Sequence, residues 1–229
     1  MQKIDLFLDN TDSFHHNLVD PKMPTVSQSI ANKIIDTRYF EVRFSLFKNE
    51  PDKPLAIYVV NAEGDKNGAV LSVKGLQIAN YQCRKYSKDY NIKGIVSCSN
   101  EDLNEKLSSL NQDISVLHIR GHGQFIRRWA NAKLNNISTN TQILLEACTT
   151  FDIAKPEESI AYKIAQSNNC EVFAVPCKIN FAQPVIKVDH YNQPKIKSLG
   201  AFSASAQPIK SFRLYCKNQV SHSNINISI

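Results

Sequence analysis

The sequence predicts an α/β fold built on a mainly parallel sheet of about six strands, with helices on both faces. Apolar runs of strand length, helical stretches between them and turn-forming residues at the junctions support this prediction. Of the 229 residues, 42% are hydrophobic and 21% are charged, and the mean hydropathy is -0.31. This composition is typical of a globular protein and excludes collagen-like, coiled-coil and disordered chains.

Each expected element follows from its local pattern. Apolar runs predict strands at residues 55–60, 92–98, 114–119, 141–147 and 171–175, with 209–216 as a candidate sixth strand. Amphipathic spacing predicts a helix at 73–89, Asn100 is a candidate cap for a helix at 100–112, and Pro156 begins a helix at 157–166. Strands joined by helices in this order lie parallel, and reactive groups gather beyond their carboxyl ends.

The ends of the chain are less regular. Residues 54–218 are expected to form the main domain, and residues 219–229 a flexible tail. Residues 1–53 are expected to be an N-terminal segment, such as a pro-segment, a lid or a small subdomain. Within it, strands are expected at 3–8 and 39–47 and a helix near 27–35.

Charge and cysteine usage narrow the function classes. The net charge of +6 comes from scattered residues and no nucleic-acid motif accompanies it, so no nucleic-acid partner is expected. No apolar run approaches the roughly 20 residues of a membrane span. No CxxC pair occurs among the 6 cysteines, so reduced thiols are expected. The first residues do not resemble a secretory signal, which predicts a cytoplasmic protein or one delivered to a host cytosol by another route.

Two predicted strand ends carry residues suited to catalysis. The strand at 114–119 leads to His122 and Gly123, and the strand at 141–147 leads directly to Cys148. Adjacent parallel strands would bring both ends to one edge of the sheet. There an imidazole can take the proton of the thiol, which makes the sulfur a nucleophile.

This pair of motifs resembles the caspase-like cysteine peptidases, a superfamily with a three-layer αβα sandwich. Its members include caspases, legumains, clostripain, CHAT proteases and the cysteine protease domains of bacterial toxins. Glu146-Ala147-Cys148 is most similar to legumain, whereas the His-x-x-Gly-His-Gly run at 118–123 is more similar to CHAT and toxin domains. The resemblance covers residues 54–216. The stretch between the two motifs is shorter than is usual in the family and leaves room for one hairpin at 124–140. The substrate cleft on that side is therefore expected to be trimmed, or else built by the N-terminal 50 residues.

The resemblance implies a cysteine endopeptidase that acts on a protein or peptide substrate through a thioester. His122 would be the general base and Cys148 the nucleophile, with the backbone amides of Gly123 and Cys148 as the oxyanion hole. It leaves autoprocessing and a role as a bacterial effector or toxin open. No cofactor is required, although toxin domains of this superfamily are activated by inositol hexakisphosphate, so an anionic activator is one hypothesis. Oligomeric state is not predicted.

Glu146 is the candidate specificity residue, because the family often places the residue two before the cysteine at the substrate pocket. A carboxylate there would favour Lys or Arg at the cleavage position, with Asn as the second choice. Asp65 and Glu63 are further candidates for the same pocket. A purely structural carboxylate at Glu146 is the alternative.

Other interpretations of the same residues stay open. The chain could be a catalytically silent adaptor, or a thiol deamidase or acyltransferase that uses the same Cys–His pair. His118, His122 and Cys148 could in principle hold zinc, although no metal is expected because 118–122 is predicted to be extended. A basic cluster is either a solvated face or an anion-binding surface; it comprises Arg120, Arg127, Arg128 and Lys133.

Overall fold

The computed structural model describes residues 36–179, 181–202, 208–209, 212–216 and 225–228. A seven-stranded sheet with the strand order β10-β9-β5-β4-β3-β1-β2 forms its centre. Five neighbouring strands are parallel, namely β1 (Leu55–Asn61), β2 (Asn91–Ser97), β3 (Ile114–Arg120), β4 (Gln142–Glu146) and β5 (Glu171–Ala174). At one edge, β9 (Phe212–Cys216) and β10 (Ile225–Ser228) are antiparallel. The predicted α/β class and mainly parallel sheet are confirmed.

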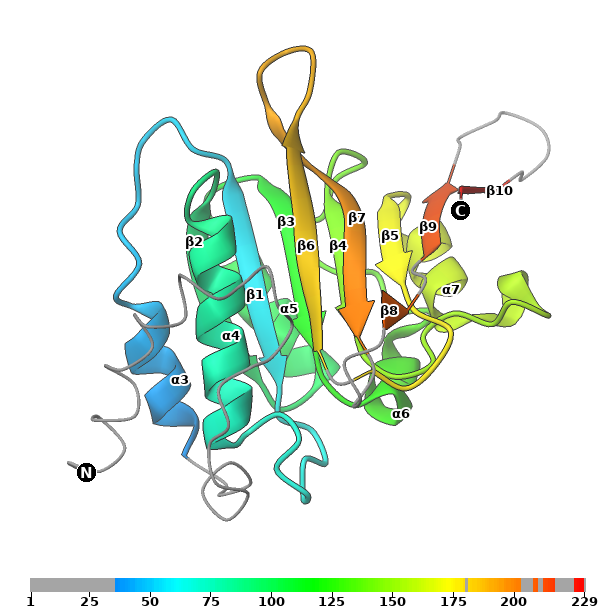
Figure 1. Cartoon of the computed structure of the whole chain (residues 1–229), viewed down its shortest axis with the longest axis horizontal. Helices are drawn as coiled ribbons and strands as arrows, with labels where there is room; N and C mark the ends of the chain where they lie inside the picture. Colours follow the sequence, from blue (N-terminus) through cyan, green and yellow to red (C-terminus); the bar gives the residue numbers. More distant parts are fainter. Residues whose placement is uncertain (1–35, 180, 203–207, 210–211, 217–224, 229) are drawn as a thin grey trace.

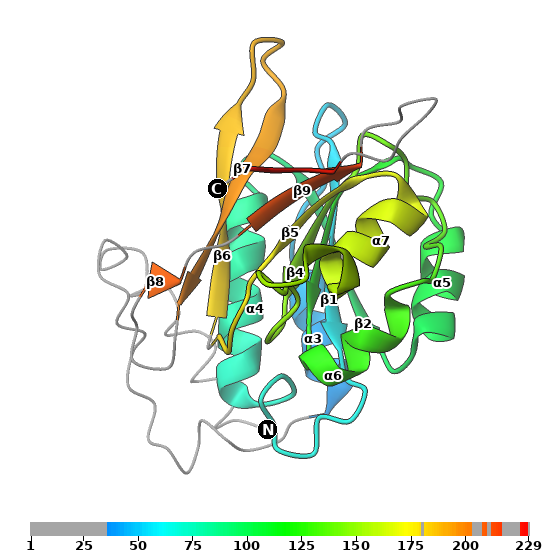
Figure 2. The same cartoon turned by 90° about the vertical axis from the view of Figure 1, so that its right-hand side faces the viewer.

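Helices cover both faces of this sheet (Figures 1 and 2). One face carries α5 (Asn100–Ser108), α6 (Gly123–Ile126) and α7 (Ile160–Asn168), and the other carries α3 (Thr37–Phe44) and α4 (Val73–Tyr86). Short 3-10 turns occur at Arg127–Trp129 and Pro156–Glu158. The α4 side also carries an antiparallel sheet that was not predicted, made of β6 (Phe181–Val188), β7 (Pro194–Phe202) and β8 (Pro208–Ile209).

The apolar spacing of the helices explains this packing. Leu103 and Leu107 of α5 are fully buried in the core on one side of the sheet, and Leu76 and Tyr86 of α4 are buried on the other. Serine side chains cap α4, α5 and α7 by accepting hydrogen bonds from first-turn amides, which satisfies donors that a helix leaves unpaired. For α5 the cap is Ser99 and not Asn100, so the predicted cap was wrong by one residue.

The predicted strand at 39–47 is wrong, because this segment forms α3. Asp36 caps the helix by accepting a hydrogen bond from the Arg38 amide. Phe40 and Phe44, four residues apart, lie on the buried face, and the Phe44 ring packs against Gly94 of β2. The described part of the N-terminal segment therefore belongs to the main domain's core and is not a separate subdomain.

The structure corrects two further expectations. The segment 124–140 contains no hairpin, because it begins with α6 and the 3-10 turn at Arg127–Trp129. Four residues of the expected tail form β10 and pair with β9. The elements expected at 3–8 and 27–35 lie outside the described residues. Among the described residues, every helix is too short or too polar to cross a membrane.

Candidate active site

The register of the central sheet brings the two predicted motifs together. Arg120, the last residue of β3, lies opposite Glu146, the last residue of β4. Just beyond the strands, the Gly121 amide donates to the Glu146 carbonyl at 3.2 Å. The loops that carry His122 and Cys148 therefore leave the sheet side by side, as predicted for adjacent parallel strands.

Gly123 allows the two loops to come into backbone contact. A Cβ atom at this position would lie 1.9 Å from the Cys148 carbonyl oxygen and 3.5 Å from its amide nitrogen. No side chain fits there, so only glycine permits this approach. The close contact fixes the backbone of the residue after His122 against the backbone of Cys148.

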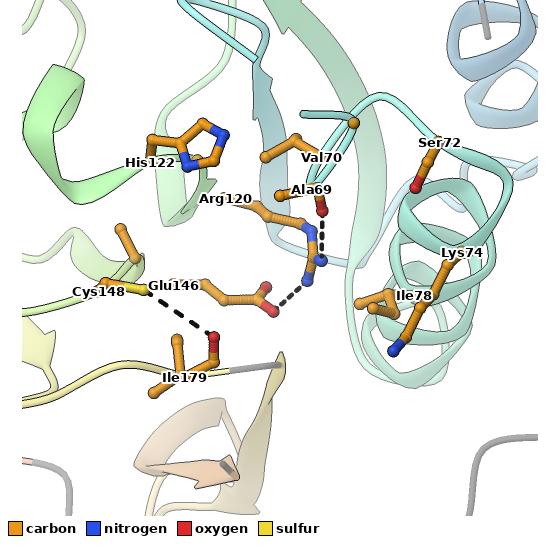
Figure 3. A pocket seen from close by; sticks show the side chains of 13 residues that line it. Ala69, Val70, Ser72, Lys74, Ile78, Arg120, His122, Glu146, Cys148 and Ile179 are labelled. Atoms are coloured by element: carbon orange, nitrogen blue, oxygen red, sulfur yellow. Dashed lines mark hydrogen bonds and ion pairs between the residues drawn. The ribbon is translucent and has the colours of Figure 1, made fainter. Parts of the chain in front are cut away.

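A cavity of about 200 Å³ lies at this junction (Figure 3). His122 and Cys148 line one side of it, and residues at the start of α4 line the other. Arg120 and Glu146 extend between these two sides, and Ile179 closes the lower edge. The cavity is smaller than the ~300 Å³ at which pockets for drug-sized ligands begin, so its size suits a single side chain.

Asp65 fixes the orientation of the His122 ring. Its Oδ1 lies 2.8 Å from Nε2 of His122, and its Oδ2 accepts hydrogen bonds from the amides of Val70 and Leu71. Burial would raise the pKa of Asp65, but the bonds from His122 and the two amides outweigh it and leave the pKa below 3.8. An ionised carboxylate only accepts, so Nε2 carries the proton and Nδ1 is the nitrogen that can act as a base.

The backbone around Cys148 is held in an uncommon conformation. Thr149, directly after Cys148, has φ of 55°, which is rare for a β-branched residue. The Thr149 amide donates to the Cys177 carbonyl at 3.1 Å, and the Thr150 amide donates to Val175 at 2.9 Å. These bonds stabilise a sharp turn after β4. Cys148 is partly exposed there, with Sγ 3.9 Å from the Ile179 carbonyl.

Glu146 is buried and is fully engaged by the protein itself. Its side chain contacts Arg120, His118 at 3.0 Å and the Gln82 amide group at 2.8 Å, and it accepts from the Ala182 amide at 2.9 Å. Burial would raise the pKa of this carboxyl, but the charge of Arg120 and the bond from His118 outweigh it and lower the pKa below 4.5. The alternative of a structural carboxylate fits these contacts better than a free charge awaiting a basic substrate.

The other two pocket candidates lie elsewhere. Asp65 is not among the residues that line the cavity, because its carboxylate is turned to His122. Glu63 pairs with Arg128, whose side chain is mostly exposed, and it does not line the cavity either. Of the basic cluster, Arg120 is only 5% exposed and belongs to the cavity floor, so the solvated-face interpretation is wrong for this residue.

Several lining residues were not predicted. Ser72 and Lys74 come from the start of α4, and Ile179 comes from the segment before β6. The signal for Arg120 was present, since it is a charged residue at the end of an apolar strand and lies two positions before His122. Nothing in the sequence indicated that Lys74 and Ile179 line the cavity, because their positions there depend on how α4 and the segment before β6 pack against the central sheet.

The comparisons with known proteins add no family. No family model matches the chain, and no curated protein is significantly similar to it.

Within the part of the chain that the structure describes, no three His, Cys, Asp or Glu side chains are grouped closely enough to hold a metal ion. His118 and His122 instead face Glu146 and Asp65, respectively.

For the cysteine peptidase that the sequence motifs lead us to expect, replacing Asp65 by asparagine should lower kcat of peptide hydrolysis by about a hundredfold with little change in KM. The new amide group would present either a donor to the Nε2 proton or a weaker, neutral acceptor, so the ring would lose its orientation. Because the pKa of Asp65 is lowered, the orienting charge is present above 3.8 and is lost only as pH falls through the lower folded value. The kcat ratio of the two proteins should therefore be constant between about pH 5 and 8.

Asn67→Ala is the matched control for this variant. Asn67 lies in the same loop, where it accepts a bond from the Ala69 amide at 3.1 Å in an exposed position. It should leave kcat unchanged. A loss in Asp65→Asn that is confined to KM, or that equals the loss in the control, would show that Asp65 does not act through His122.

Proposed function

We propose that the chain is a caspase-like cysteine endopeptidase with Cys148 as nucleophile and His122 as base. The observation that carries the proposal is a cavity lined by both His122 and Cys148, with the His122 imidazole oriented by Asp65 and the Gly123 backbone packed against that of Cys148. A nucleophile, a base and an orienting carboxylate on neighbouring loops form the arrangement that activates a thiol.

The proposed reaction uses these groups in turn. His122 takes the thiol proton at Nδ1, and the Cys148 sulfur attacks the carbonyl carbon of the scissile peptide bond. The amides of Gly123 and Cys148 donate to the oxygen that becomes negative. Collapse of this intermediate breaks the C–N bond, and His122 returns the proton to the leaving amine. Water, deprotonated by His122, then attacks the thioester carbonyl, the C–S bond breaks and the carboxylic acid is released, and His122 returns the proton to the Cys148 sulfur.

The caspase-like sandwich is part of this proposal. Five parallel strands between two helical layers and the order of the His-Gly and Cys loops support it. The antiparallel sheet of β6, β7 and β8 beside α4 adds a wall near the cavity, since Ala182 of β6 donates to Glu146. This wall supplies surface on the side opposite the short 124–140 segment.

The test is product analysis on a mixed peptide library. Wild-type protein and Cys148→Ala are incubated with the library, and new termini are identified by mass spectrometry. New termini that appear with the wild type and not with Cys148→Ala support an endopeptidase. A side-chain mass change without cleavage would instead indicate a deamidase or acyltransferase, and no change in either sample would indicate an adaptor.

A further inference from the structure

Glu146 and Arg120 form the floor of the cavity and differ in how many of their hydrogen-bonding groups already have partners in the protein. A carboxylate has about four acceptor sites, and Glu146 receives four donors. Oε1 accepts from Arg120 and from the Ala182 amide, and Oε2 accepts from His118 and Gln82. The acceptor capacity of Glu146 is therefore filled from within the protein.

The roles of His118 and Gln82 are fixed by their own partners. The Tyr86 hydroxyl lies 3.0 Å from Nδ1 of His118, so it can donate there while Nε2 of His118 donates to Glu146. The Gln82 amide group also donates to the Ala182 carbonyl, and its oxygen accepts from Tyr58. This closed network holds Glu146 away from a substrate.

Arg120 differs from Glu146, because not all of the N–H groups of its guanidinium have a good hydrogen-bond acceptor. One terminal nitrogen of its guanidinium pairs with Glu146, and the other reaches the Ala69 carbonyl only at 3.5 Å. Its Nε is buried and has no hydrogen-bond partner. A buried donor left without an acceptor is costly, and Arg120 lines the cavity (Figure 3).

The start of α4 also borders the cavity. The helix is 14 residues long and begins after Ser72, and residues at its first turn line the cavity. The Ser72 hydroxyl already accepts from the Gly75 amide at 3.1 Å, and the helix dipole makes this end attractive to an anion. Lys74 also lines the cavity, which places its ammonium group beside the start of the helix.

We propose that this cavity binds the side chain of the residue that precedes the scissile bond, and that it selects a carboxylate, Asp or Glu. The inference rests on the proposed peptidase function and replaces the expected preference for Lys or Arg. A basic side chain would bring more donors to a carboxylate whose acceptor sites are already filled, whereas an acidic side chain supplies an acceptor to Arg120, whose Nε has no partner.

The test uses fluorogenic tetrapeptides that differ only in the residue before the bond, namely Asp, Glu, Asn, Gln, Lys or Leu. Asp and Asn have nearly the same shape and differ in charge. We expect kcat/KM for the better acidic peptide to exceed that for its amide counterpart or Leu by at least about tenfold, with Lys slowest. Fastest cleavage after Lys, or equal cleavage after Asp and Asn without a Glu preference, would overturn the inference.

A charge reversal at Lys74 checks where the selection arises. Lys74→Glu should lower the Asp-to-Asn ratio of kcat/KM severalfold. Lys88→Glu makes the same change in charge at an exposed position just after the other end of α4, and it should leave this ratio unchanged. Equal ratios in the two variants would contradict selection by the start of α4.

A second measurement separates failure of this inference from failure of the peptidase proposal. Tetrapeptides ending in Asp, Glu, Asn or Lys are tested for protection of Cys148 from iodoacetamide, read by peptide mass spectrometry. Protection by acidic peptides alone, without cleavage of any substrate, would retain the acidic pocket and reject the peptidase. Cleavage with a basic preference would retain the peptidase and reject the acidic pocket, and neither protection nor cleavage would reject both.

Discussion

Cys148→Ala and His122→Ala are each expected to reduce kcat/KM for peptide hydrolysis by at least about a thousandfold. In the proposed mechanism, the first variant lacks the sulfur that would form the thioester, and the second lacks the group that would take the thiol proton and return it to the amine. Because these groups act as a unit, the double variant should be hardly slower than either single variant. The measurement is kcat/KM on the best peptide of the panel.

Cys177→Ala is the control for this pair. Cys177 is an exposed thiol whose carbonyl accepts a bond from the Thr149 amide, a backbone contact that survives the substitution. It should retain near wild-type activity, and the variants should unfold at temperatures close to that of the wild type. Hydrolysis that persists in Cys148→Ala would reject the assignment of the nucleophile.

Glu146→Ala is expected to destabilise the protein by about 3–5 kcal/mol, because it leaves the buried Arg120 without its carboxylate. Three further donors, from His118, Gln82 and Ala182, lose their acceptor at the same time. The free energy of unfolding is measured in urea near neutral pH. Glu158→Ala, which breaks the exposed pair with Lys155, should cost no more than about 1 kcal/mol.

The difference in unfolding free energy between the wild type and Glu146→Ala is expected to become smaller as the pH falls. The folded pKa of Glu146 lies below its ordinary value of 4.5, so its contribution to stability is complete above that value. The contribution is lost as the pH falls through the lower folded pKa. The unfolding free energies of wild type and Glu146→Ala should therefore approach each other in acid. A loss in Glu146→Ala of less than about 1 kcal/mol at neutral pH would show that the network does not hold this edge together.

The position of the site could be predicted because it depends on local signals and one topological rule. The apolar runs before His122 and before Cys148 identify two strands, and their parallel order places both carboxyl ends at one edge. The role of Asp65 depends on a loop after β1 that folds back to His122. No periodic pattern in the sequence records such a contact.

The error at 39–47 has a specific cause. Apolar residues at positions 40, 42, 44 and 46 alternate as in a strand, yet 40 and 44 also satisfy the helical spacing. The structure buries Phe40 and Phe44 and leaves Val42 and Leu46 63% and 62% exposed. The Asp36 cap favours the helix, and the exposed pair shows that the alternation did not reflect burial.

The interpretation of Glu146 required knowledge of its partners. Arg120 lies opposite it only because of the strand register, and Gln82 and Ala182 come from α4 and β6. Each of these contacts joins segments far apart in the chain. A carboxylate two residues before Cys148 thus predicted a charged pocket. Which charge the pocket would prefer in a ligand depended on whether Glu146 is already paired, and this is set by the three-dimensional contacts.

The rate of alkylation of Cys148 by iodoacetamide at neutral pH tests most directly whether His122 activates this thiol. Cys177, exposed in the same molecule, is the internal reference, and both sites are followed by peptide mass spectrometry. We predict that Cys148 reacts at least about tenfold faster than Cys177 in the wild type, and that His122→Ala removes this advantage. Equal rates at the two cysteines in the wild type, or a Cys148 rate unchanged in His122→Ala, would contradict the account.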